Sequence, residues 1–404
     1  MIMKRIMMFA ATLAFAFSVS AQKFEAPKPT CEFEGLKVKI GADFALQFQA
    51  LDHSTGSLTD TLVTLGNNFN LPTANLNLNA VLADGVSMHL RTYLSARHHR
   101  EAWVKGGHIM IDKLDFISDG FLSGVMKYTT LKVGLDEINY GDAHFRRTDN
   151  ARAITNPFVG NYIMDAFTTE AFGEIYFRHS GALLMLGLSN GHLNQTVLKT
   201  VGTEDKVSLY GKLGYDRNFS DDFRVRLTGS FYANQGDSRK YLYGGDRGGS
   251  RYYSVLQAKS GAVNDFTGRF NPDFKKLTAI QINPFVKFKG AELFGVYEIA
   301  NGSSGGTDDF KGTYNQLGVE LLYRFGSDER FYVGGRYNTV SGKQTETSKD
   351  RKIQRINVGA GWFLTKNIIT KLEYVQQTYS GDGWTGTLYN GKFNGVMLEA
   401  AISF

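Results

Sequence analysis

The chain has 404 residues, a formal net charge of +6 and a mean hydropathy of −0.24. This mild charge argues against a nucleic-acid binder, and the single cysteine, Cys31, excludes an internal disulfide. With 45 glycines, 6 prolines and 13% aromatic residues, the composition is typical of many strands joined by glycine-containing turns.

Residues 1–21 have the pattern of a secretory signal peptide. A basic pair precedes an apolar run over residues 6–19, and the run ends in the small-residue cleavage site Val19-Ser20-Ala21. We expect cleavage after this site, which removes two basic residues and no acidic one and leaves a net charge of +4. A periplasmic leader at 22–35 and a single folded domain at 36–404 are then expected.

Alternation of apolar and polar residues along the folded domain predicts β-strands. After the signal, no apolar run approaches the roughly 18 residues of a spanning helix, so a membrane protein with this sequence must form a closed barrel. The Asp84-Gly85 pair is a strong two-residue hairpin signal. We predict sixteen strands, at 36–50, 70–83, 86–97, 103–111, 126–136, 171–178, 182–189, 206–216, 223–235, 278–288, 291–300, 314–325, 331–341, 353–364, 368–379 and 393–404.

Long and short connections alternate between these strands, as they do in barrels with external loops and periplasmic turns. The chain also ends on an alternating strand whose last residue is Phe404, which resembles the signal that outer-membrane barrels present to their insertion machinery. The prediction is an all-β, transmembrane antiparallel β-barrel in the outer membrane of a Gram-negative bacterium. A count of 14 or 18 strands stays open, because 103–111 and 182–189 alternate only weakly and 252–258 also has the pattern of a strand.

The polar face of each strand must line the lumen, because a charge on the lipid face at the bilayer midplane costs about 2–4 kcal/mol. Basic residues outnumber acidic ones on this face, and basic rings in a pore favour anions. An anion-selective channel and a general channel with a transverse field both stay open. The predicted pore-lining residues are Arg91, Lys132, Arg224, Arg226, Arg336, Arg355, Lys371, Glu320 and Glu373.

The segment Glu137–Glu170 is the long loop after the fifth strand. Because the loop at this position folds inward in sixteen-stranded barrels of this type, the segment is predicted to constrict the channel. His144, Arg146, Arg147 and Arg152 are its candidate constriction residues, since guanidinium groups bind phosphate and carboxylate in bidentate fashion. In the alternative interpretation, these arginines pair with loop acids and pin the loop to the wall. The acids expected to pair with them are Asp142, Asp149, Asp165 and Glu170.

The loop sequences at 140–150 and 156–167 resemble porin-type outer-membrane proteins of the Bacteroidetes, which are related to the phosphate-selective porin family. The resemblance implies a trimeric sixteen-stranded channel for small solutes, with anions among them. The dense arginine ladder of the phosphate-selective members cannot be traced along this chain.

The sequence therefore predicts a porin for passive diffusion of small hydrophilic solutes, surrounded by outer-membrane lipid. No catalytic, cofactor or metal site is expected, and the Gly-x-Ser-x-Gly signature of hydrolases is absent from the sequence. Two alternatives are a non-conducting barrel that binds surface partners and an outer-membrane enzyme.

Overall fold

The computed structural model describes residues 22–26, 28, 33–95, 102–199, 202–245, 252–260, 264–303 and 310–404. The predicted signal peptide and Cys31 lie outside these described residues.

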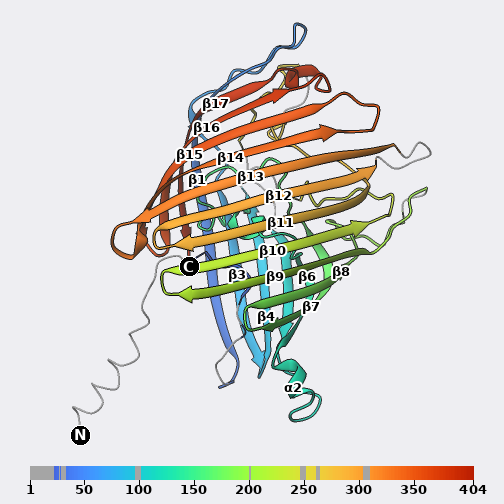
Figure 1. Ribbon diagram of the computed structural model, residues 1–404, viewed down its shortest axis with the longest axis vertical. Coiled ribbons are helices and arrows are strands. Elements are labelled where there is room, and N and C mark those ends of the chain that lie inside the picture. The colour runs from blue at the N-terminus through green and yellow to red at the C-terminus, as the bar shows by residue number, and fades with distance from the viewer. Residues whose placement is uncertain are drawn as a thin grey trace.

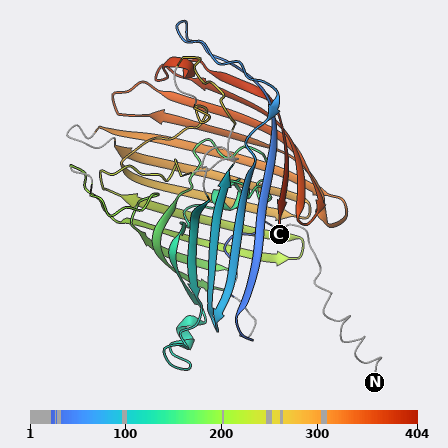
Figure 2. The ribbon, with the colours of Figure 1, turned by 180° about the vertical axis from the view of Figure 1, so that it is seen from behind.

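Sixteen strands form one closed antiparallel ring, in which each strand pairs with the next and the last pairs with the first (Figures 1 and 2). The closing pair places Phe48 opposite Leu398 and Ala45 opposite Ala401. Closure leaves no strand edge without a partner, which is the condition for strands to lie in hydrocarbon. The predicted count of sixteen is confirmed.

The boundaries of the ring strands lie within a few residues of the predicted ones. The strands are β1 (Lys37–Ser54), β3 (Thr73–Ala83), β4 (Val86–Ser95), β5 (Trp103–Ile111), β6 (Thr129–Glu137), β7 (Thr169–His179), β8 (Ala182–Ser189), β9 (Ser208–Ser220), β10 (Phe223–Asn234), β11 (Lys276–Phe288), β12 (Ala291–Ser303), β13 (Lys311–Phe325), β14 (Phe331–Lys343), β15 (Arg351–Thr365), β16 (Ile368–Ser380) and β17 (Lys392–Ser403). A two-residue strand, β2 (Asn68–Phe69), pairs with β1 outside the ring.

In the described part of the chain, helical structure is limited to single turns in the connections. They are α2 (Ser123–Met126) and the 3-10 turns η1 (Ala143–Arg146), η2 (Ser327–Glu329) and η3 (Gly386–Leu388). The strand predicted from residue 126 begins at Thr129, because α2 and the turn that follows it extend to Tyr128, whose N–H bonds to Val125 O at 3.0 Å. No helix in the described part of the chain is long and apolar enough to cross a membrane.

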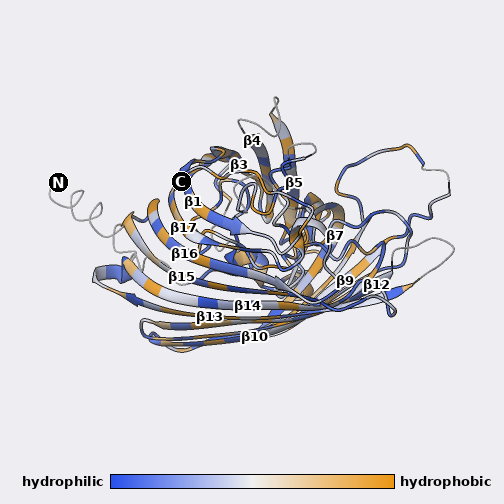
Figure 3. Ribbon diagram, turned by 90° about the horizontal axis from the view of Figure 1, so that it is seen from above, coloured by the Kyte–Doolittle hydropathy of each residue, from blue (hydrophilic) through white to orange (hydrophobic). Residues whose placement is uncertain are grey.

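The barrel is apolar outside and polar inside, the reverse of a soluble protein. On β13, Leu317, Val319 and Leu321 are exposed, whereas Gln316 and Glu320 are buried. Figure 3 shows this alternation of hydropathy along the strands, with the connecting segments running inside their curve. Such an outer surface is stable only in lipid, which places the barrel in a membrane.

Aromatic side chains form a stacked row on the outer surface, beside the turn between β13 and β14. The ring centroids of Tyr323, Phe325, Phe331 and Trp362 follow one another at 6.3, 5.7 and 5.8 Å. Aromatic rings of this kind favour the boundary between hydrocarbon and water. The row therefore marks one edge of the membrane-spanning band.

The two ends of the barrel differ in the length of their connections. Turns 84–85, 180–181, 221–222, 289–290 and 366–367 lie at the same end as the start of β1 and the end of β17. This short-turn end corresponds to the periplasmic side in barrels of this type. Apart from the β5–β6 connection at 112–128, which contains α2, the long loops lie at the opposite, external end.

Two long loops fill much of the interior. Nearly all of the β6–β7 loop at 138–168, called the inner loop below, is buried, as the prediction of an inward fold requires. The β10–β11 loop at 235–275 also enters, with Tyr243, Tyr252 and Phe270 buried. The barrel wall offers apolar partners for its aromatic residues: the ring of Tyr252 lies 5.3 Å from that of Phe393 on β17.

The first described residues of the predicted leader, 22–26, lie at the short-turn end of the barrel and are partly buried inside it. Gln22 and Phe24 are buried there, at 8% and 7% exposure. The segment therefore occupies lumen space rather than standing apart from the domain.

Candidate functional site

The inner loop is fastened to the wall by a buried row of alternating charges. Arg146 Nη1 donates to Glu292 Oε1 at 2.6 Å, and Arg146 Nε donates to Glu320 Oε1 at 3.1 Å. The second oxygens of these carboxylates accept from Arg324 Nε at 2.9 Å and Arg336 Nε at 2.8 Å. Burial opposes the charge of Arg146, but Glu320 and Glu292 outweigh it and raise the pKa of the guanidinium. Arg146 therefore joins the loop to β12 and β13.

Arg147 joins two parts of the inner loop to each other. Its Nε and Nη2 donate to the two oxygens of Asp165 at 2.9 and 2.6 Å, and its guanidinium lies over the ring of Phe167 at 4.0 Å. Asp165 is one of the loop acids that the pinning interpretation expected as a partner. The geometry of Arg146 and Arg147 thus favours pinning, with wall carboxylates added to the expected partners.

Arg152 and His144 both contact Glu137, the last residue of β6. Arg152 Nη1 lies 3.7 Å from Glu137 Oε2, and the Arg152 side chain remains 26% exposed. His144 is buried and hydrogen-bonds to Glu137 through Nδ1, while its Nε2 lies 3.1 Å from Asn139 Oδ1. Of the four predicted constriction residues, Arg152 keeps the most contact with solvent.

The predicted lining residues on β13–β16 face the interior, but the inner loop covers them. They are Glu320, Arg336, Arg355, Lys371 and Glu373. Arg336 and Lys371 donate to loop carbonyls at 2.7 and 2.6 Å, and Glu373 accepts a loop N–H at 2.7 Å. These side chains bind the loop, and their contact with passing solutes stays a prediction.

The predicted lining residues on β10 also lie in ion pairs. Arg226 donates to both oxygens of Asp142 at 2.7 and 2.9 Å, which ties the inner loop to β10. Arg224 donates to both oxygens of Asp216 at 2.8 and 2.7 Å and stays 18% exposed. The wall from β9 to β17 therefore serves mainly to hold the loops.

Across the lumen, the wall of β3–β6 keeps polar side chains in contact with solvent. The described residues that do so are Asn77, Asn79, His89, His108 and Lys132. The rings of His89 and His108 lie 5.3 Å apart, and His108 Nδ1 is 2.7 Å from Asp136 Oδ2. Arg91 donates from Nε to Asn77 at 2.9 Å. This accessible wall, with Arg152 and Glu137 at its border, is the candidate solute path.

Sequence reasoning missed two interior side chains of β5, Lys105 and His108. A β-bulge opposite Arg91 and Thr92 shifts the register, so that Lys105 turns inward and pairs with Asp149 of the inner loop. A bulge adds one residue to one strand and breaks the strict alternation on which the prediction depended. The Gly106-Gly107 pair is the sequence signal that could have indicated it.

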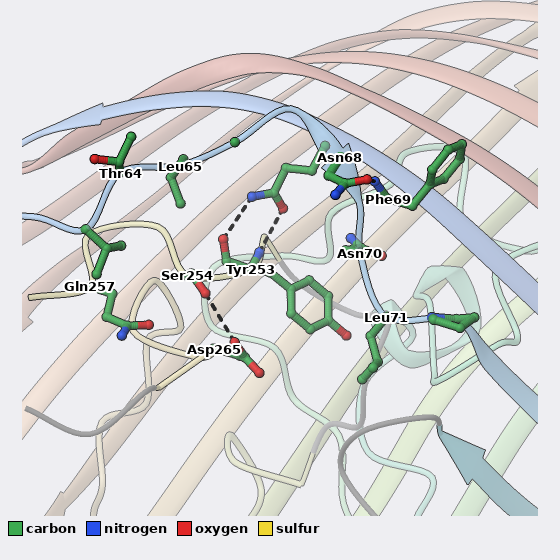
Figure 4. A pocket seen from close by; sticks show the side chains of 14 residues that line it. Thr64, Leu65, Asn68, Phe69, Asn70, Leu71, Tyr253, Ser254, Gln257 and Asp265 are labelled. Carbon is green, nitrogen blue, oxygen red and sulfur yellow. Dashed lines mark hydrogen bonds between the residues drawn. The ribbon is translucent and has the colours of Figure 1, made fainter. Parts of the chain in front are cut away.

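A cavity of about 530 Å³ opens at the external end, between the β1–β3 loop and the β10–β11 loop (Figure 4). Gln49 of β1 clamps the backbone of Tyr253: its Nε2 donates to Tyr253 O at 2.8 Å, and its Oε1 accepts from Tyr253 N at 2.9 Å. Ser254 Oγ donates to Asp265 Oδ1 at 3.1 Å. The cavity is lined by a mixture of polar and apolar residues from the two loops.

Within the described residues, no group of three or more His, Cys, Asp or Glu side chains could hold a metal ion. The arrangement is suited to the passage of solutes. Polar groups on one wall can replace part of a solute's hydration, and the packed loops limit the size of solute that fits. A closed sixteen-stranded barrel with an apolar coat, a polar interior and a loop folded against its inner wall is an outer-membrane barrel of the porin type.

No protein-family model and no curated protein matches the chain. Solved structures resemble it in fold. They include an anion-selective porin from Comamonas acidovorans (TM-score 0.54, 11% identity, 91% of this chain and 100% of that one) and the outer membrane channel DcaP of Acinetobacter baumannii (0.54, 11%, 93% and 99%). A third is the outer membrane protein OmpT of Vibrio cholerae in its trimer form (0.53, 10%, 92% and 100%).

At these identities the likeness establishes the fold. It agrees with the porin-type part of the resemblance carried by the inner-loop sequence. Origin in the Bacteroidetes and kinship with phosphate-selective porins stay predictions.

Proposed function

We propose that this chain is a passive diffusion channel for small hydrophilic solutes, with a mild preference for anions and no catalytic step. The observation that carries the proposal is the solvent-contacting polar wall of β3–β6 inside a barrel whose outer surface is apolar. A solvent-contacting polar wall would serve no purpose in a barrel without a pore. In a channel, it lowers the free energy of moving a hydrated solute through the membrane.

The charge balance of this wall supports the anion preference. Arg91, Lys132 and Arg152 contribute three positive charges, whereas Asp136 and Glu137 contribute two negative ones. Low-dielectric walls focus the resulting field into the lumen. A solved anion-selective porin shares the fold.

We also propose a homotrimer, because the OmpT structure with this fold includes a trimer form. Equal conductance steps in groups of three, closing one after another under voltage, are the expected signature.

The test is single-channel recording of protein purified from outer membranes, in planar bilayers under a KCl gradient. We expect discrete open levels and a reversal potential of the sign that anion selectivity gives. Arg152→Ala should shift that potential toward cations, because it removes an accessible positive charge at the border of the path.

Arg217→Ala is the matched control, because Arg217 is exposed on the outer face of β9 and its loss should leave selectivity unchanged. Equal effects of the two variants would contradict the proposed path. A folded barrel that conducts nothing would reject the channel and favour a partner-binding protein or an outer-membrane enzyme.

A further inference from the structure

The described residues 22–26 and Lys28, called the N-terminal segment below, lie along the inner wall at the short-turn end of the barrel. At one end, Lys28 Nζ donates to the carbonyls of Met126 and Thr129, beside the start of β6. At the other, Gln22 O accepts from Arg224 Nη1 of β10 at 2.6 Å. Between these ends, Arg178 Nη1 of β7 donates to Ala26 O at 2.7 Å. The segment therefore follows the inner wall from β6 to β10 and occupies lumen space beside it.

The aromatic residue of the segment fills an apolar gap beneath the inner loop. The Phe24 ring lies edge-on to Phe145 of the inner loop and to Phe285 of β11, with centroid separations of 5.8 and 5.3 Å. The guanidinium of Arg226 lies over the Phe24 ring at 4.2 Å. Gln22 Oε1 accepts from Arg146 Nη1 at 2.9 Å. The segment therefore contacts both the loop and the wall.

The carboxylate of Glu25, the acid of the segment, is surrounded by donors from the wall and the inner loop. Arg226 Nη2 lies 3.0 and 2.9 Å from the two oxygens of Glu25, and Lys212 Nζ lies 3.3 Å from Oε1. Asn139 Nδ2 donates to the same Oε1 at 3.2 Å. Burial opposes the charge, but Lys212 and Arg226 outweigh it and hold the pKa of Glu25 below its usual range.

Lys212, Arg224 and Arg226 form what we call the cationic cluster of β9 and β10. It has two carboxylate partners besides the segment, Asp142 and Asp216. With the segment in place, three positive charges meet three negative ones. Without it, one positive charge is left unmatched inside the barrel, where an uncompensated charge is costly.

From these contacts we infer that the N-terminal segment is a tethered plug, and that the cationic cluster is a carboxylate-binding site that holds the plug through Glu25. When the segment leaves, the periplasmic half of the lumen widens and the cluster becomes available to carboxylate solutes. The consequence for transport rests on the proposed channel function, whereas the docking itself does not.

Docking can be measured without conduction, by electron paramagnetic resonance of a spin label on the plug. Lys23→Cys, in a Cys31→Ser background, places the label at an exposed side chain of the segment. An immobilised spectrum is expected for the parent. Glu25→Gln should lower the ratio of docked to undocked segment by about tenfold or more, because charge-assisted hydrogen bonds are each worth about that factor.

Glu34→Gln is the matched control, because Glu34 lies in the same leader but is exposed and pairs only locally with Lys37. A mobile label in the parent would overturn the docking, and an immobilised label in Glu25→Gln would overturn the carboxylate site.

Planar-bilayer recording then tests the plug. Glu25→Gln should raise the open-channel conductance and shift the reversal potential further toward anions, whereas Glu34→Gln should do neither. Undocking without any change in conductance would overturn the plug. If no variant conducts, the proposed function fails, and the spectra alone still decide whether the segment occupies the cluster.

Discussion

A guanidinium in a water-poor interior is stable only beside carboxylates, and Arg146 has two of them. Both come from the barrel wall, so the ion pairs that satisfy this residue also dock the inner loop. Arg152 shows the contrasting case, since its single carboxylate neighbour lies at 3.7 Å and water reaches the side chain. The same residue type therefore serves docking at one position and the solute path at another.

Arg146→Met should undock the inner loop, because it keeps an unbranched apolar stem but removes the guanidinium, which leaves Glu292 and Glu320 short of positive charge. Removing one partner of a buried ion pair costs about 3–5 kcal/mol. Hydrogen exchange of residues 138–168 in reconstituted protein measures the effect. Arg152→Met is the control and should cost about 1 kcal/mol or less; equal losses of protection would contradict the assignment.

At the scale of elements, the two loops that fill the barrel meet at Gly160. A Cβ on this residue would overlap the hydroxyl of Tyr252, which comes from the β10–β11 loop. That hydroxyl donates to Glu373 Oε1 at 2.6 Å, while Val159 N donates to the other oxygen at 2.7 Å. One wall carboxylate thus holds both loops, and glycine is what allows them to approach.

Gly160→Ala should therefore loosen both loops together. Overpacking of a filled interior typically costs about 1–3 kcal/mol, and the displaced Tyr252 also loses its bond to Glu373. Hydrogen exchange should rise in 138–168 and in 252–260. Gly173→Ala is the control, because nothing lies within 4 Å of its added carbon; a Gly160 variant as silent as this one would contradict the contact.

At the scale of the whole molecule, the surrounding lipid sets the stability of the barrel. Leu398 lies near the middle of β17 and Ile402 near its end, and both are exposed on the outer face. The cost of a charge on this face depends on its depth in the bilayer. The two positions therefore probe the depth of the hydrocarbon band.

Leu398→Arg should destabilise the folded barrel by about 2–4 kcal/mol, and Ile402→Arg by about 0–1 kcal/mol, as expected for midplane and interface. Equilibrium unfolding by urea in lipid vesicles gives both values. Because the variants share strand, face and chemistry, similar losses would show that the spanning band is placed wrongly along β17.

The sequence by itself determined the strands, their two faces and the even count. Alternation along β13 already assigns Glu320 to the interior and Leu321 to the lipid, because side chains in a strand point alternately to its two faces. The same local rule failed at Lys105, where a bulge interrupts it, and gave no sign of the two-residue strand β2.

The tertiary structure alone decided which charges meet. Arg146 pairs with residues 146 and 174 positions away, and Gln22 lies against the same guanidinium across 124 positions. Such contacts depend on the closure of the ring and on the path of the loops inside it. Neither leaves a repeating pattern in the sequence from which it could be predicted. For the same reason, only the folded barrel shows that residues 22–26 occupy lumen space and that most predicted lining residues hold loops.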